Sequence, residues 1–314
     1  MSGKCLSVLL LAGIAAPTHA QGFGDEDDPG IYIAPAKEIS FFAHAHGDAY
    51  LPARSSGRRG GRVASYGLKT RVGADIPVDE DTDVTVVVGQ TSMGYDFRSW
   101  NDFGPGRGDP LDYGVRLELG SIFSHQIDDD WSLFGGAYVT TSGEAEALFD
   151  DSFTYGGSFG LMHHVHEDLA LGLAIVVFGQ MEDYTLVFPL PTLNWQIDNY
   201  WHLDIGKTST GLPGAEITYK INDDWSVGVN GGLDIYQFRL EDDNNALANG
   251  VLEDTAVPVY FLTTYSPEPN FTITGRIGSA FYRELSLRNS SGDKVGSQKL
   301  EPSFALGISC EYRF

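Results

Sequence analysis

The last twelve residues of the chain alternate between two kinds of side chain. Large apolar side chains and Cys310 occupy every second position from Phe304 to Phe314, and the positions between them hold small, polar or charged residues: Ser303, Ala305, Gly307, Ser309, Glu311 and Arg313. Successive side chains of a β-strand point to opposite faces, so this segment predicts a strand with one apolar and one polar face. A membrane β-barrel needs that division, with lipid outside and water or packed polar groups inside.

The same alternation recurs upstream, in residues 65–76, 112–120, 225–235 and 271–281. A soluble β-sandwich also alternates apolar and polar residues and is the alternative fold. The length of the segments favours the membrane barrel, because a tilted transmembrane strand has about 9 to 11 residues and a globular strand usually about 5 or 6.

A short motif occurs three times, at 126–133, 196–203 and 220–227. Each copy has an Ile, then two or three Asp or Asn residues among its turn positions, then a Trp, which predicts two strands joined by a tight turn. Aromatic residues at such turns form the girdle at one membrane interface. We therefore expect an interface girdle made of Trp131, Trp201, Trp225, Tyr312 and Phe314.

The pattern predicts an antiparallel up-and-down transmembrane β-barrel of about fourteen strands. They are expected near 38–46, 62–76, 83–98, 110–127, 131–144, 151–165, 168–181, 183–197, 200–207, 213–221, 225–238, 253–266, 271–284 and 302–314. Twelve strands is the alternative, since the first strand and those between 168 and 221 alternate least clearly. Connections after even strands are short, whereas 47–61, 99–109, 239–252 and 285–301 are long loops, the asymmetry of outer-membrane barrels.

The N-terminus matches a secretory signal peptide. Lys4 precedes an apolar run from 6 to 16, and the small-residue site Thr18-His19-Ala20 follows it. The expected organisation is a signal peptide at 1–20, an N-terminal periplasmic segment at 21–37 and the barrel at 38–314. Cys310 is then the only thiol of the mature chain, so neither a disulfide nor a cysteine metal site is expected within one chain.

The charge balance and two short motifs limit the partners and the protein class that the chain can have. With 43 acidic against 20 basic residues, the chain has no broad basic face for nucleic acid. The ending Glu311-Tyr312-Arg313-Phe314 resembles the C-terminal assembly signal of bacterial, porin-like outer-membrane β-barrel proteins. The stretch 189–197, Pro-Leu-Pro-Thr-Leu-Asn-Trp-Gln-Ile, followed by Trp201, is similar to a family of barrels known only as a domain of unknown function. The resemblance implies outer-membrane lipid and the barrel-assembly machinery as partners, and carries over no substrate, cofactor or catalytic residue.

The polar faces of the predicted strands supply the candidate lumen residues. They carry both signs of charge: Lys69, Arg71, Asp75, Arg116, Glu118, Glu216, Lys220, Asp234, Arg276, Glu311 and Arg313. Such groups either line a wet pore and orient a polar solute or pair across a closed interior. Eight strands leave room only for side chains and 16 to 18 leave an aqueous channel, so about fourteen permits both.

Other local features invite functional readings. Arg54, Arg58, Arg59 and Arg62 form a basic cluster in the first external loop, which fits either anion binding or a solvated loop. No metal site is expected, because no carboxylate or cysteine completes one with the histidines at 44, 46, 163, 164 and 166.

The leading hypothesis is a passive channel for small polar solutes or ions. The alternatives are a barrel-embedded hydrolase, for which no G-x-S-x-G motif is present, or a structural or adhesin barrel with a plugged lumen.

Overall fold

The computed structural model describes residues 38–56, 61–100, 103, 105–106, 108–147, 149–182, 185–209 and 213–314. The expected signal peptide at 1–20 and periplasmic segment at 21–37 lie outside these residues. No helix in the described part of the chain has both the length and the apolar character needed to cross a membrane.

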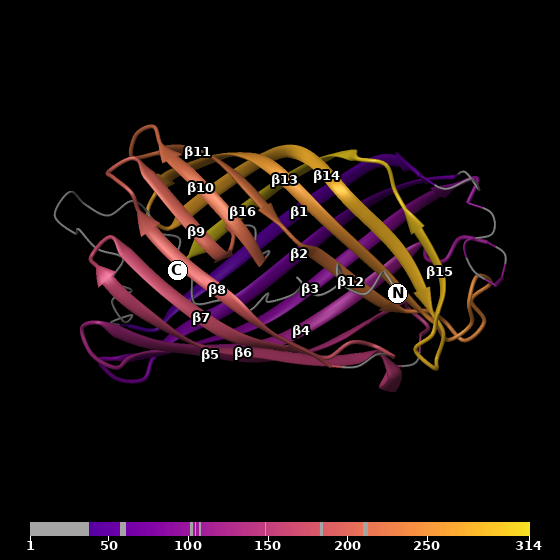
Figure 1. Ribbon diagram of the computed structural model, residues 1–314, viewed down its shortest axis with the longest axis horizontal. Coiled ribbons are helices and arrows are strands. Elements are labelled where there is room, and N and C mark those ends of the chain that lie inside the picture. Colours follow the sequence, from indigo (N-terminus) through magenta and orange to yellow (C-terminus); the bar gives the residue numbers. More distant parts are fainter. Residues whose placement is uncertain are drawn as a thin grey trace, which may run out of the picture.

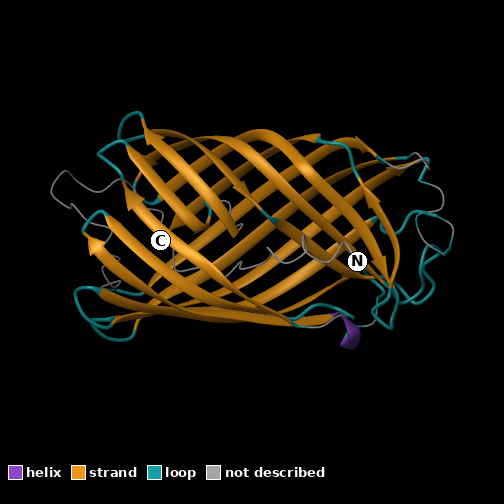
Figure 2. Ribbon diagram, viewed as in Figure 1, coloured by secondary structure: helices purple, strands orange, loops and turns teal. Residues whose placement is uncertain are grey.

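Antiparallel strands make up nearly all of the structure (Figure 2). They are β1 Ser40–Arg54, β2 Arg62–Pro77, β3 Thr82–Arg98, β4 Tyr113–Gln126, β5 Trp131–Gly143, β6 Phe153–His166, β7 Leu169–Phe178, β8 Leu186–Gln196, β9 Trp201–Lys207, β10 Pro213–Lys220, β11 Trp225–Gly232, β12 Asp234–Arg239, β13 Val251–Glu268, β14 Phe271–Arg288, β15 Lys294–Lys299 and β16 Ser303–Arg313. A single 3₁₀ turn, η1 Asp150–Ser152, precedes β6.

Fourteen of these strands close into a ring, because β1 joins β2 to β16 and β13 joins β11 to β14. The remaining two strands are not part of the ring. β12 pairs with the first residues of β13, and β15 pairs with the last residues of β14. In Figure 1 the ring strands tilt strongly relative to the long axis. The predicted barrel of fourteen strands is therefore confirmed, and the alternative of twelve is wrong.

Three predicted boundaries are wrong. Residues 47–54 were expected in a loop but continue β1, where the small residues Gly47 and Ala49 stand in place of the large apolar side chains that mark the other strands. Within the expected loop 285–301, β14 extends to Arg288 and the polar strand β15 follows. The segment 225–238 was expected to be one wall strand, whereas its second part is β12, which leaves the ring.

The outside of the ring is apolar. Outward side chains such as Leu119, Val139 and Ile175 are well exposed on the surface, and they alternate with inward residues that are buried or partly buried. Exposure of a continuous apolar band around a closed barrel is the arrangement that lipid requires. The chain is thus a transmembrane β-barrel.

The three copies of the sequence motif form the same turn. In each, the first Asp or Asn accepts hydrogen bonds from the backbone N–H groups two and three residues later: Asp128 from Asp130 and Trp131, Asp198 from Tyr200 and Trp201, Asn222 from Asp224 and Trp225. The side chain thereby takes the place of a backbone turn partner. These turns share one end of the barrel with 78–81, 167–168 and 269–270, and the longer connections lie at the other end, as predicted.

Candidate site: the barrel interior

Strand β12 crosses from the wall into the interior. It continues the register of β11 against β13, from Trp225 opposite Tyr265 to Arg239 opposite Val251. On the other edge, pairing with β10 ends at Gly232 of β11. The tip of β12, at Arg239, instead pairs in parallel with Gly143 of β5 on another part of the wall. At the loop end, β12 therefore divides the space inside the ring.

The tip of β12 is held by hydrogen bonds and one ion pair. Arg239 is almost fully buried, and its guanidinium donates to the backbone oxygens of Asp151 and Asn249 and to Glu182, at 2.6 Å for the carboxylate. The Gln237 backbone oxygen accepts from Ser142 Oγ at 2.6 Å. These contacts join β12 to the connections that follow β5 and β7.

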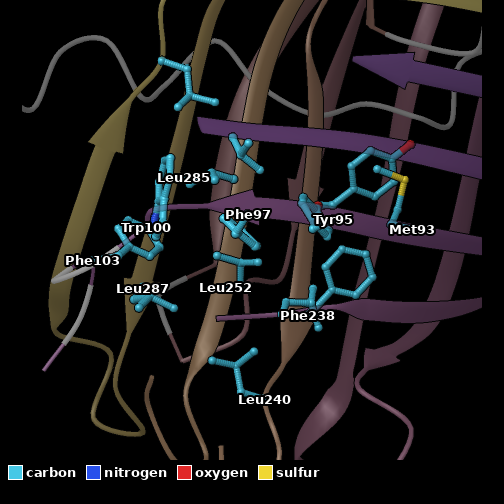
Figure 3. Packing of buried hydrophobic residues seen from close by; sticks show 14 of the residues in the cluster. Met93, Tyr95, Phe97, Trp100, Phe103, Phe238, Leu240, Leu252, Leu285 and Leu287 are labelled. Atoms are coloured by element: carbon cyan, nitrogen blue, oxygen red, sulfur yellow. The ribbon is translucent and has the colours of Figure 1, made fainter. Parts of the chain in front are cut away.

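Apolar side chains fill the interior at the loop end. This mouth cluster brings together side chains from β1, β2, β3, β12, β13, β14 and three connecting segments (Figure 3); its buried members are Ala53, Val63, Met93, Tyr95, Phe97, Trp100, Phe103, Leu111, Tyr236, Phe238, Leu240, Leu252, Leu285, Leu287 and Leu300. Phe97, Trp100 and Phe103 pack edge to face, with ring centroids 5.3 and 5.5 Å apart.

Two long connections that contribute side chains to this cluster also bond to each other. The backbone N–H of Gly106 donates to the Ala246 oxygen at 3.0 Å, and Asn244 Nδ2 donates to the Pro110 oxygen at 3.0 Å. Glu144 accepts from Asn244 and from the backbone of Glu241, and burial raises the pKa of the Glu144 carboxyl. Described residues of the two connections 99–112 and 240–250, which both contribute to the mouth cluster, are thus bonded to each other.

A buried ion pair lies beneath the mouth cluster. Arg283 donates to both carboxylate oxygens of Asp254, at 2.9 and 2.6 Å, and to Ser65 Oγ. Tyr95 donates to the same carboxylate, and the guanidinium lies 4.7 Å from the centre of the Tyr50 ring. A bidentate pair with several further partners is the geometry in which two charges can be buried together.

The predicted lumen residues occupy the middle and the turn end of the interior, mostly in ion pairs. Arg71 and Arg116 both donate to Glu118, at 3.0 and 3.2 Å. Arg313 donates to Asp75 at 2.9 Å and to Glu311 at 3.1 Å. The structure therefore brings these six residues into two clusters, each containing both signs of charge.

A third cluster encloses a small pocket near mid-barrel. Arg276 donates to Asp48 at 2.8 Å, and His46 contacts both of them. Lys69 and Asp234 complete the polar lining together with Tyr236 and Tyr260. Asp234 also accepts from Tyr50, at 3.2 Å.

The other predicted residues lie apart. Glu216 is buried and accepts from Ser209 and Asn230, and Lys220 pairs at the turn end with the exposed Asp223. Arg54 and Arg62 face each other across β1 and β2, and both are exposed; Arg58 and Arg59 lie outside the described residues. No cluster of three or more potential metal ligands occurs in the described part of the chain.

The residues expected to form the girdle lie at the turn end and are exposed. Trp131 stacks on His163, Trp201 packs on Tyr219 and Trp225 stacks on Tyr265, with ring centroids 4.5 to 4.9 Å apart. Tyr312 and Phe314 meet edge to face at 4.8 Å. Their role at the membrane interface stays a prediction.

Sequence reasoning missed Asp48 and Arg283, for different reasons. Asp48 lies in the part of β1 that was expected to be a loop. Arg283 is inward although it is an odd number of residues from the inward Arg276, because the pairing of β13 with β14 shifts between Val257 and Pro258 and leaves Phe281 as an extra residue. A β-bulge of this kind reverses the faces beyond it. Only the loss of alternation at 281–283 could have indicated it.

A family model described as "Domain of unknown function (DUF6268)" matches residues 112–314. No curated protein matches the chain.

Three solved structures match most of the chain. The COG4313 outer membrane channel from Pseudomonas putida F1 has 10% identity and a TM-score of 0.49, covering 93% of this chain and 100% of that one. The TodX monoaromatic hydrocarbon channel deltaS2 mutant has 9% identity and a TM-score of 0.49, covering 89% and 91%. A Pseudomonas aeruginosa FadL homologue has 10% identity and a TM-score of 0.45, covering 87% and 90%.

Proposed function

The chain belongs to the DUF6268 family, and from the geometry of its interior we propose that it is an outer-membrane channel for small hydrophobic molecules. The mouth cluster supports the proposal most directly. It places aromatic and aliphatic side chains, rather than polar ones, across the loop end of the barrel. A polar solute would have to give up its hydration there, whereas an apolar solute gains free energy by leaving water.

The mouth cluster includes parts that can move to admit a solute. Trp100, Phe103 and Leu111 come from the connection 99–112, and Leu240 begins the connection after β12. Loops open more readily than paired strands, since fewer backbone hydrogen bonds have to break. The ring itself can stay intact while these side chains separate.

Channels for small polar solutes or ions are the second candidate, and the charged clusters of the middle and turn end favour it. Groups such as Arg71, Arg116 and Glu118 can replace part of the hydration shell of a passing ion. In the structure they are engaged with each other, so an ion would compete with existing partners.

Two assays on the same folded protein separate these candidates. The first follows uptake of radiolabelled naphthalene by Gram-negative cells that carry the protein in the outer membrane. The second records single-channel conductance of the refolded barrel in a planar bilayer. The proposed function predicts faster uptake than in cells with an empty vector, and no stable conductance steps at rest.

A matched variant links uptake to the mouth cluster. Phe103→Asp puts a charge among the apolar side chains and is expected to lower uptake, whereas Phe149→Asp changes an exposed aromatic residue outside the cluster and is expected to leave it unchanged. Stable conductance steps with no gain in uptake would instead establish the polar channel. A heat-modifiable, correctly inserted barrel with neither activity would reject both.

A further inference from the structure

Two arginines at the loop end of the barrel have no counter-charge. Arg54 and Arg62 are both exposed, and neither side chain has a hydrogen bond or an ion pair with any residue that the structure describes. Every other arginine among the described residues forms an ion pair, including the exposed Arg98, which pairs with Asp96 at 2.6 Å. In a chain with 43 acidic and 20 basic residues, two neighbouring arginines without a carboxylate are unexpected.

The two arginines lie directly opposite each other on the outer surface of β1 and β2. Earlier in β1 the even-numbered residues, such as Asp48 and Tyr50, point into the interior. The β1–β2 register then shifts between Tyr50 and Ala53, which gives β1 one extra residue and reverses its faces. Ala53 therefore joins the mouth cluster, and Arg54 points outward beside Arg62. Like charges directly opposite on a sheet are destabilising, so this arrangement favours an anion between the two side chains.

The arginine pair lies just beyond the lipid-facing band. Arg62 alternates with the buried Val63 and shares the outer face of β2 with the exposed Tyr66 and Leu68. Exposed tyrosines are typical of the level at which a barrel wall meets the headgroups. Arg62 is four residues beyond Tyr66, which is roughly 13 Å along the strand and about 10 Å along the membrane normal at a tilt of about 40°. The guanidinium groups are therefore at headgroup level, on the side of the long loops.

The charges next to the pair also favour an anion. The exposed Lys299 of β15 is held beside the end of β1, because its backbone oxygen accepts from the Ser56 N–H at 2.9 Å. The backbone N–H of Glu301 donates to the Arg54 oxygen at 2.8 Å, but the Glu301 carboxylate forms no ion pair with Arg54 or Arg62. Three cations and one carboxylate thus gather at this point of the surface.

We propose that Arg54 and Arg62, with Lys299 beside them, form a headgroup site that binds the phosphate groups of lipopolysaccharide in the outer leaflet. A guanidinium group binds phosphate through two parallel hydrogen bonds, and strands about 4.8 Å apart place two such groups against one phosphate or two neighbouring ones. The bound anion also removes the repulsion between the two arginines. The headgroup site rests on the location of the barrel in the outer membrane and not on the solute that it transports.

Enrichment of labelled lipid around the barrel tests the headgroup site. Ser92 lies on the outer face of β3, opposite the exposed Leu68, so Ser92→Cys in a Cys310→Ala background can carry a donor dye. The barrel is refolded into phosphatidylcholine vesicles that contain a small fraction of acceptor-labelled lipid A, without divalent cations. Energy transfer is compared for diphosphorylated lipid A and for its dephosphorylated analogue, and the ratio reports the binding that depends on phosphate.

We expect the barrel to enrich the diphosphorylated lipid, and the double variant Arg54→Gln/Arg62→Gln to lose at least about tenfold in relative affinity, because charge-assisted hydrogen bonds are removed. Lys294→Gln is the matched control: Lys294 is an exposed cation at the same end, but its charge is already paired with Glu284. It should leave the enrichment unchanged. Equal enrichment by the double variant and the unaltered barrel, both heat-modifiable, would overturn the headgroup site.

Two further measurements on the unaltered barrel need no variant. Added NaCl should weaken the enrichment, because exposed charges are screened by salt, and enrichment that is insensitive to salt would overturn the site. Millimolar inorganic phosphate should leave the enrichment in place; if it abolished the enrichment, the arginines would bind soluble phosphate and the lipid assignment would be wrong. Naphthalene uptake is a separate readout, so failure of the proposed transport and failure of the headgroup site are distinct results.

Discussion

At the scale of single residues, the interior is organised by pairing of opposite charges rather than by free charges. Glu118 accepts hydrogen bonds from two arginines, and Asp75 accepts one from Arg313. Asp254 accepts hydrogen bonds from two nitrogens of Arg283, Nε and Nη2. Arg283 and Asp254 are 1% and 3% exposed, so neither can recover hydration if its partner is lost. Breaking a buried pair is far more costly than breaking an exposed one.

Asp254→Asn is therefore expected to destabilise the barrel by about 3 to 5 kcal/mol, since it leaves the buried guanidinium without a counter-charge. Urea titration of the refolded protein in vesicles, followed by tryptophan fluorescence, measures the change. Asp96→Asn is the control, because its pair with Arg98 is exposed and no measurable shift is expected. Equal midpoints for the two variants would contradict the assigned importance of the buried pair.

Part of the interior could be predicted from alternation alone. Arg71, Arg116 and Glu118 lie on strands whose pairing has no shift near them, so their inward direction follows from neighbouring apolar residues. Arg283 could not be placed in this way, because the bulge at Phe281 reverses the faces. The partner of each charged side chain could not be predicted from the sequence either, since the partners come from strands distant along the chain.

At the scale of elements, β12 decides the shape of the interior. It directly continues β11. On one edge β11 pairs with β10, whereas on the same edge β12 pairs with the end of β5. The exchange brings Tyr236 and Phe238 into the mouth cluster and buries Leu233 and Ile235. One short strand thus both helps to fill the mouth and buries two apolar side chains that would face lipid if it stayed in the wall.

Arg239→Ala is expected to loosen the β12 tip, because it removes four hydrogen bonds to Asp151, Asn249 and Glu182. Hydrogen bonds that involve a charged group contribute about 1.5 to 3 kcal/mol each, so the docked tip should lose at least about 2 kcal/mol. Planar-bilayer recordings should show brief openings in the variant that are absent from the unaltered barrel.

Arg98→Ala is the matched control for Arg239→Ala, since it removes an exposed arginine at the same end of the barrel. Recordings from this control should match the unaltered protein. If Arg239→Ala were equally silent while remaining folded, the mouth would be sealed without help from the β12 tip.

At the scale of the whole molecule, the position of the apolar exterior indicates which residues lie near the bilayer midplane and which lie near its surface. Leu119 is 52% exposed at the middle of β4, opposite Val88 and Val139 on the neighbouring strands. Val78 is similarly exposed but lies in the short turn between β2 and β3. The two positions have the same kind of side chain at different depths.

Leu119→Arg is expected to destabilise the folded barrel by about 2 to 4 kcal/mol, the cost of arginine near the bilayer midplane, and Val78→Arg by about 1 kcal/mol or less. Folding into vesicles across a urea series measures both values. Similar costs at the two positions would show that the apolar band does not have the depth assigned to it.

The sequence by itself determined the ring of strands, the apolar exterior, the repeated Asx turns and the asymmetry between short turns and long loops. These features are local, because alternation and turn residues act within a few positions of the chain. Only the tertiary structure decided that 234–239 leaves the wall, that apolar residues of distant segments meet in the mouth cluster and that β8 pairs with β9 through four residues. The alternation of β11 continues unchanged into β12, so a strand that stays in the wall and one that crosses the interior look alike until their neighbours are known.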